Sequence, residues 1–149
     1  MVRGLCGVRT GATKSGVGLG WPGPEMSTRS WKELGVRPNR VKAKLQAGEA
    51  SVGSWLTCPH PLVAELMAHV GFDWLVVDME HGTIGVESME VMLQAISTTD
   101  TVPMVRVTWN DISLIKRPLD SGAYGVVIPM VSTREDAVRA VQACKYPPQ

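Results

Sequence analysis

Residues 102–131, VPMVRVTWNDISLIKRPLDSGAYGVVIPMV, contain two apolar runs separated by a segment with helical features. Val102–Val107 and Gly125–Val131 are short and nearly continuous in apolar character, as strands of a parallel sheet buried on both faces are. Asp111–Leu119 begins at an asparagine–aspartate pair, which predicts a capped helix. This stretch therefore predicts a strand, a helix and a second strand.

The same alternation extends in both directions along the chain. The other predicted elements are helix Asn39–Gly48, strand Ser51–Thr57, helix Pro61–Val70, strand Trp74–Met79, helix Val86–Ile96 and helix Thr133–Lys145. Strict alternation of strands and helices predicts a parallel sheet with right-handed crossovers. Four such units span residues 51–146, and a closed TIM (β/α)8 barrel needs about eight. We therefore expect an α/β fold, the N-terminal half of a TIM (β/α)8 barrel. A doubly wound sheet is the rival, but no GxGxxG turn follows any strand.

Two helices carry finer predictions. Leu62, Leu66 and Val70 recur at a spacing of four residues and, joined by Val63 and Met67, are expected to form the apolar stripe of helix 61–70. Thr133 precedes Asp136 by three residues, which approximates a capping box at the start of the last helix.

Composition limits the classes of partner. With a net charge of +1 and 19% charged residues, the chain has no electrostatic feature that indicates nucleic acid. No apolar run reaches the roughly 18 residues that span a bilayer, so we expect no membrane partner. The three cysteines, Cys6, Cys58 and Cys144, form neither a CxxC pair nor a disulfide framework. This pattern favours a reducing compartment, the cytoplasm.

The first 37 residues differ from the remainder. They contain eight of the fifteen glycines and six basic but only two acidic residues, without sustained apolar periodicity. We expect residues 1–37 to form a disordered basic extension and residues 38–149 to form the barrel domain. The composition is also compatible with a mitochondrial transit peptide. The alternative is an unstructured extension without a targeting role.

Polar residues gather where the predicted strands end. These residues are Asp78, Glu80, His81 and Arg106. Chemistry in α/β folds is found at the carboxyl ends of the strands. Because charged groups are costly to bury unless they pair or meet a ligand, their concentration predicts a site.

The motifs themselves resemble those of the HpcH/HpaI aldolase family. They are GFDWLVVDMEH at 71–81, the stretch 102–131 quoted above and YPP at 146–148, which together give the linked pattern DxEH, VRxxWND and IKRxLDxGA. The family includes 4-hydroxy-2-oxoheptanedioate and 2-dehydro-3-deoxyglucarate aldolases, and the resemblance covers residues 39–149. It implies an aldehyde-lyase that cleaves 4-hydroxy-2-keto acids to pyruvate and an aldehyde, and that is a homo-oligomer at full length.

The resemblance also implies roles for single residues. His81 matches the proton acceptor, Arg106 the residue that steadies the keto acid and the transition state, and Asp120 the carboxylate that raises the basicity of the histidine. Each residue also has a purely structural alternative. His81 would be a loop histidine bonded to backbone, Arg106 would form an ion pair with Asp78 or Glu80, and Asp120 would be an ordinary acid at a helix end.

Two further residues are candidates for the same site. Asp78 is expected to share in orienting His81, with a core carboxylate bonded to backbone as the alternative. Trp55 is expected to line the pyruvate pocket, and simple core packing is the equal alternative.

Aldol cleavage also needs an electrophile for the enolate oxygen. No lysine lies at a predicted strand end to form a Schiff base, so a divalent metal is the favoured Lewis acid. By resemblance this metal is Mg, Mn or Co, and its Glu and Asp ligands are expected beyond Gln149. We therefore predict weak or absent metal binding and little aldolase activity for the chain alone. Two competing hypotheses are a non-catalytic fragment of such an aldolase and an acyl-CoA lyase of the citrate lyase β type.

Overall fold

The computed structural model of the chain describes residues 37–146. The chain divides into two compact units, Met1–Pro38 and Asn39–Gln149, and the second contains all the elements described below. The predicted basic extension lies outside the described residues except at its end.

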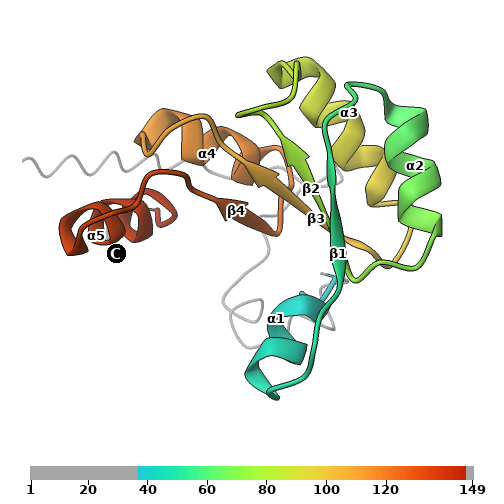
Figure 1. Cartoon of the computed structure of the whole chain (residues 1–149), viewed down its shortest axis with the longest axis horizontal. Helices are drawn as coiled ribbons and strands as arrows, with labels where there is room; N and C mark the ends of the chain where they lie inside the picture. Colours follow the sequence, from blue (N-terminus) through green and yellow to red (C-terminus); the bar gives the residue numbers. More distant parts are fainter. Residues whose placement is uncertain (1–36, 147–149) are drawn as a thin grey trace, which may run out of the picture. The chain divides into compact units, whose positions relative to one another are not determined.

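Nine helices and strands alternate through the described part of the chain (Figure 1). They are α1 Arg40–Gln46, β1 Gly53–Leu56, α2 Pro61–His69, β2 Trp74–Asp78, α3 Val86–Ile96, β3 Val102–Arg106, α4 Ile112–Asp120, β4 Gly125–Val127 and α5 Arg134–Ala143. The strands form one parallel sheet in the order β1-β2-β3-β4. A helix follows each strand, so the prediction of a partial TIM-barrel-like α/β fold is confirmed.

The core lies between the sheet and its helices. The side chains of Leu75, Val77 and Val105 project from one face of the sheet and are fully buried. They belong to one apolar cluster with Met89, Met92, Leu93 and Ile96 of α3. The amphipathic spacing of these α3 residues is what directs that helix onto the sheet.

The apolar stripe predicted for α2 is only partly buried, with Met67 packed against the core. Leu62, Leu66 and Val70 are 55%, 61% and 66% exposed, whereas Ala64 and Ala68 are buried. The two alanines belong to the same cluster as the α3 side chains, and their small size allows the helix to approach closely. Spacing in the sequence identified an apolar stripe but not which stripe faces inward.

The last strand is shorter than predicted, because β4 ends at Val127 instead of Val131. Pro129 has no backbone N–H to offer a neighbouring strand. Met130 has a φ of 55°, which lies in the left-handed region and is incompatible with an extended strand. The predicted capping box at Thr133 and Asp136, in contrast, is confirmed.

Helix α1 covers the end of the sheet at which the strands begin. The Asn39 side chain donates a hydrogen bond to the carbonyl of Tyr124, just before β4, at 3.1 Å. Lys44 forms an ion pair at 2.6 Å with Asp73, just before β2. These two contacts tie α1 to the amino ends of the strands.

On the other face of the sheet, two large side chains lie beside glycines of the neighbouring strands. Gly53 is the register partner of Trp74, and Gly125 is the partner of Met104. A Cβ atom added at Gly53 would lie 2.0 Å from Cδ2 of Trp74, so the indole occupies the space that a side chain on residue 53 would need.

We therefore expect Gly53→Ala to lower the free energy of unfolding by about 1–3 kcal/mol, because the rigid indole must move. Urea denaturation followed by circular dichroism measures this. Gly85→Ala is the matched control, since a Cβ there meets nothing nearer than 3.8 Å. A Gly53→Ala variant as stable as the Gly85→Ala variant would contradict the packing described.

Candidate functional site

The site is centred on an ion pair between the last residues of two neighbouring strands. Asp78 ends β2, Arg106 ends β3, and the two are register partners. Arg106 donates from Nε to Oδ1 of Asp78 at 2.8 Å and from Nη2 to Oδ2 at 2.5 Å. This two-pronged arrangement is the strong geometry for an arginine–carboxylate pair. It lowers the pKa of Asp78 and raises the pKa of Arg106, in each case chiefly through these hydrogen bonds.

Asp78 also holds the turn that follows β2. Its Oδ1 accepts hydrogen bonds from the backbone N–H groups of Glu80 at 3.1 Å and His81 at 3.2 Å. Only 2% of Asp78 is exposed. Because four donors saturate the carboxylate, Asp78 is suited to orient the turn and the guanidinium and not to accept a proton.

Glu80 provides a second carboxylate to the same guanidinium. Its Oε2 lies 3.2 Å from Nε of Arg106, and its Oε1 lies 3.9 Å from Nε2 of His81. From the sequence, an ion pair of Arg106 with Asp78 or Glu80 was the alternative to a functional role, and the structure contains both pairs. Glu80 therefore connects the arginine to the histidine.

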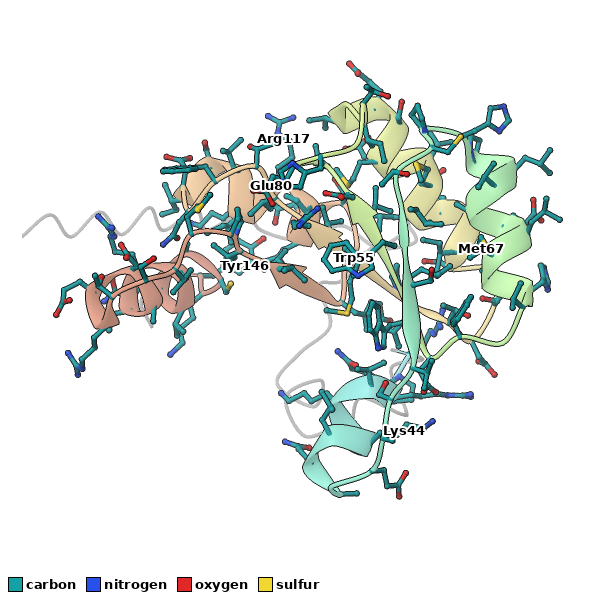
Figure 2. The ribbon with its side chains drawn as sticks, viewed as in Figure 1. Lys44, Trp55, Met67, Glu80, Arg117 and Tyr146 are labelled. Carbon is teal, nitrogen blue, oxygen red and sulfur yellow. The ribbon has the colours of Figure 1, made fainter. Side chains whose placement is uncertain are left out.

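Trp55 covers one face of the guanidinium. The Cζ atom of Arg106 lies 4.6 Å from the centroid of the indole, a cation–π geometry. Figure 2 labels Trp55. Trp55 is 43% exposed, so it is not simply a core residue. It belongs to the same face of the sheet as Asp78 and Arg106, because it is the register partner of Val76, two residues before Asp78.

His81 lies at the exposed margin of this cluster. Its side chain is 70% exposed. Its backbone is fixed by Asp78, whereas its imidazole has only the distant Glu80 oxygen as a charged neighbour within residues 37–146. The ring is therefore accessible to a ligand.

Asp120 is not part of this cluster. It is the last residue of α4, and its carboxylate accepts a hydrogen bond from the Tyr146 hydroxyl. Within the described part of the chain no hydrogen bond or ion pair joins Asp120 to His81. The role that the family resemblance implies for Asp120 remains a prediction.

The residues of the cluster do not fit a complete divalent metal site. No group of three or more His, Cys, Asp or Glu residues that could hold a metal occurs within residues 37–146. The oxygens of Asp78 are already engaged by Arg106 and two amides. Cys58 and Cys144 are free thiols and belong to no such group.

The arginine, carboxylate and histidine side chains lie at the carboxyl ends of parallel strands, where barrel-type α/β proteins have their active sites. The chain is therefore of this class. A family model described as HpcH/HpaI aldolase/citrate lyase matches residues 51–149. The chain therefore belongs to the HpcH/HpaI aldolase/citrate lyase family, as its motifs predicted.

Similar curated proteins include aldolases from Salmonella. The 5-keto-4-deoxy-D-glucarate aldolases of Salmonella paratyphi A and Salmonella newport are each 41% identical to this chain over 114 residues, which is 76% of this chain and 44% of each relative. The chain thus spans less than half the length of the curated relatives it matches. These relatives are bacterial and lend no support to the mitochondrial alternative.

Solved structures agree with this assignment. An HpcH/HpaI aldolase/citrate lyase family protein from Burkholderia cenocepacia J2315 superposes with a TM-score of 0.70 at 34% identity, over 74% of this chain and 44% of that one. The citrate synthase SbnG superposes with a TM-score of 0.65 at 35% identity, over 73% and 44% of the two chains. Within residues 37–146, no helix is both long and apolar enough to cross a membrane.

Proposed function

We propose that this site serves a carbon–carbon lyase that cleaves 4-hydroxy-2-keto acids to pyruvate and an aldehyde. The observation that carries the proposal is the guanidinium of Arg106, which is held at the strand ends by two carboxylates and an indole beside an exposed imidazole. The names of the relatives cover more than one reaction, so the substrate class is taken from the family resemblance, and the arginine beside an exposed imidazole supports it.

Arg106 is arranged to bind a keto acid. Nε and Nη2 are engaged by Asp78 and Glu80, whereas no hydrogen bond within residues 37–146 uses Nη1. A fixed guanidinium with one donor edge remaining is suited to a carboxylate or a developing oxyanion, because little side-chain freedom is lost on binding.

His81 is the proposed proton acceptor. In the cleavage direction it takes the proton of the 4-hydroxyl group, and the C3–C4 bond breaks to release the aldehyde. The bonding electrons remain on the three-carbon product as the enolate of pyruvate, and the proton is then returned to C3. Arg106 stabilises the negative charge while it resides on that enolate. Asp120 is proposed to assist His81, on the family resemblance alone.

A divalent Mg, Mn or Co ion remains part of the proposal, with Glu and Asp ligands contributed from outside residues 1–149. Such an ion supplies Lewis-acid stabilisation of an enolate when it is bound. Residues 37–146 do not by themselves form a site for it.

Pyruvate binding tests the proposal without requiring turnover. Saturation-transfer NMR with the chain and pyruvate should show contact, and propionate, which lacks the keto oxygen, should bind more weakly. Equal signals for pyruvate and propionate would count against a keto-acid site. Competition by a CoA thioester instead would favour the alternative, an acyl-CoA lyase of the citrate lyase β type.

We expect little or no aldolase activity from the chain alone. A lactate-dehydrogenase-coupled assay of pyruvate release from a 4-hydroxy-2-keto acid, with Mg, Mn or Co added in turn, measures this. A full-length 5-keto-4-deoxy-D-glucarate aldolase is the positive control. Robust turnover by the chain would show that the ligands proposed to be missing are not required. Pyruvate binding without turnover would distinguish this proposal from a fragment that has lost the site.

A further inference from the structure

The apolar core of the described residues is divided into two clusters. One joins the sheet to α2 and α3, and the other contains Val107, Ile115 of α4 and Ala143 of α5. The helices follow the same division. Helix α2 packs against α3 and α5 packs against α4, whereas α3 and α4 make little contact with each other (Figure 1). The helix layer is therefore open between α3 and α4.

A cleft of about 250 Å³ lies at this division. Met79 and Met89 border it from the first cluster, and Val107 borders it from the second. Protein interiors contain few voids larger than a water molecule, so an apolar hollow of this size between two clusters is a candidate ligand site. The rest of its lining consists of Val86, Thr108, Ser113, Leu114, Arg117 and Pro118.

The cleft is on the opposite face of the sheet from the candidate active site. Met79 and Val107 directly follow Asp78 and Arg106, and successive residues of an extended strand point to opposite faces. The backbone N–H of Met79 donates to the carbonyl of Arg106, and that of Val107 donates to the carbonyl of Val127, so the ladder continues through both residues. The cleft is therefore separate from the side chains grouped around Arg106.

The walls of the cleft belong to the middle of the sheet. Its lining residues lie between Met79 and Pro118, on α3, on α4 and in the turns that follow β2 and β3. Strands β1 and β4 flank this part of the sheet on its two sides. The cleft is thus enclosed by consecutive elements, and no open strand edge contributes to it.

The floor of the cleft is apolar and its mouth is polar. Met89, Val107 and Pro118 are buried, whereas Thr108 and Arg117 are exposed. Among the described residues that line the cleft, only Arg117 is charged (labelled in Figure 2). No hydrogen bond or ion pair within residues 37–146 uses its guanidinium. An apolar floor below an unpaired cation is complementary to an organic anion with an apolar body.

Two acids lie near this mouth, and neither pairs with Arg117. Glu90 and Asp120 line an adjoining hollow to which Arg117 also contributes. Glu90 accepts a hydrogen bond from the Ser121 hydroxyl at 2.9 Å, and Asp120 accepts one from the Tyr146 hydroxyl. The positive charge of Arg117 therefore remains available to a ligand.

We propose that this cleft binds a small carboxylate with a compact apolar body, such as an arylacetate. The body fills the apolar floor between the two core clusters, and the carboxylate meets the Arg117 guanidinium at the mouth. The volume of about 250 Å³ is just under the roughly 300–1,000 Å³ of sites for drug-sized molecules, so the ligand should have on the order of ten non-hydrogen atoms. This inference does not depend on the proposed function.

Titration of phenylacetate into the full chain, followed by NMR of the methionine methyl groups, tests the site. We expect saturable shifts of the Met79 and Met89 signals. Benzyl alcohol, which lacks the charge, should bind about 2-fold to 5-fold more weakly, because an ion pair at an exposed mouth stays partly solvated. Acetate, which lacks the ring, should bind at least about 10-fold more weakly. Unchanged methionine signals would overturn the proposal, as would equal affinity for phenylacetate and benzyl alcohol.

Variants separate this cleft from the site around Arg106. Arg117→Gln should weaken phenylacetate binding by about 2-fold to 5-fold. Arg134→Gln, which removes an exposed arginine of α5 outside the cleft, is the matched control and should bind as wild type does. Val86→Phe should block the cleft, and Leu114→Trp replaces it if circular dichroism shows that the phenylalanine variant does not fold.

A folded Arg106→Ala variant should bind phenylacetate as tightly as wild type does. A loss of affinity in Arg106→Ala but not in Arg117→Gln would place the ligand in the keto-acid site and overturn the proposal. Wild-type affinity in a folded cleft-filling variant would overturn it as well. Pyruvate binding should be the same in Arg117→Gln and wild type, so failure of the keto-acid site and failure of this cleft are distinguishable.

Discussion

Replacing Asp78 with alanine is expected to lower the free energy of unfolding by about 2–4 kcal/mol, a large part of the stability of a small domain. The carboxylate is buried and accepts hydrogen bonds from Arg106 and from the amides of Glu80 and His81. Without it, a half-buried guanidinium retains only Glu80, and two amides lose their acceptor. The estimate is below the full cost of breaking a buried pair because Arg106 remains partly exposed and Glu80 remains present.

The comparison requires a surface control. Asp100→Ala removes another short ion pair, Arg40 to Asp100 at 2.8 Å, whose side chains are mostly exposed. Exposed pairs contribute about 0–1 kcal/mol, so this variant should unfold close to the wild type in urea. Equal decreases in the free energy of unfolding for Asp78→Ala and Asp100→Ala would contradict a special contribution of Asp78 to stability.

The contribution of the Asp78 carboxylate to the free energy of unfolding should decrease as the pH becomes acidic. Its pKa is lowered in the folded protein below the ordinary value of 3.8. The unfolded chain then binds the proton more readily, so the ionised carboxylate stabilises the fold above about pH 4. This contribution is lost as the pH falls below that value. The stability difference between wild type and Asp78→Ala should therefore be constant near neutral pH and shrink in acid. The pKa of Asp136, lowered to about 2, affects both proteins and cancels in the difference.

Arg106→Ala is expected to weaken pyruvate binding by about 10-fold to 100-fold, the loss of about 1.5–3 kcal/mol that accompanies removal of a hydrogen bond to a charged group. Arg106→Lys keeps the charge but cannot reproduce both the paired contact with Asp78 and the stacking on Trp55. We therefore expect the lysine variant to bind more weakly than wild type and more tightly than the alanine variant.

Titration of pyruvate against isotope-labelled chain, followed by two-dimensional NMR, gives these affinities and reports folding in the same spectra. Arg40→Ala is the control, because Arg40 lies on α1, at the opposite end of the strands. Unchanged pyruvate affinity in a folded Arg106→Ala variant would remove the basis for the keto-acid site. Parallel losses in Arg106→Ala and Arg40→Ala would indicate a general charge effect instead.

Local patterns in the sequence were enough to predict the order and type of every described element. Helix α3 begins and ends where predicted, Asp111 caps α4, and Thr133 with Asp136 forms the capping box of α5. These features depend on residues within one or two turns of each other. The family motifs likewise named the residues that end β2 and β3.

The tertiary structure decided which of the possible contacts those residues make. Asp78 and Arg106 are 28 residues apart in the chain, and strand register makes them partners. The same packing places Trp55 over the guanidinium, leaves Asp120 bonded to Tyr146, and buries the alanines of α2 instead of its leucines. Periodicity reports that a segment has an apolar face. Which face is buried, and which side chains meet across strands, depends on contacts between distant parts of the chain that no local spacing specifies.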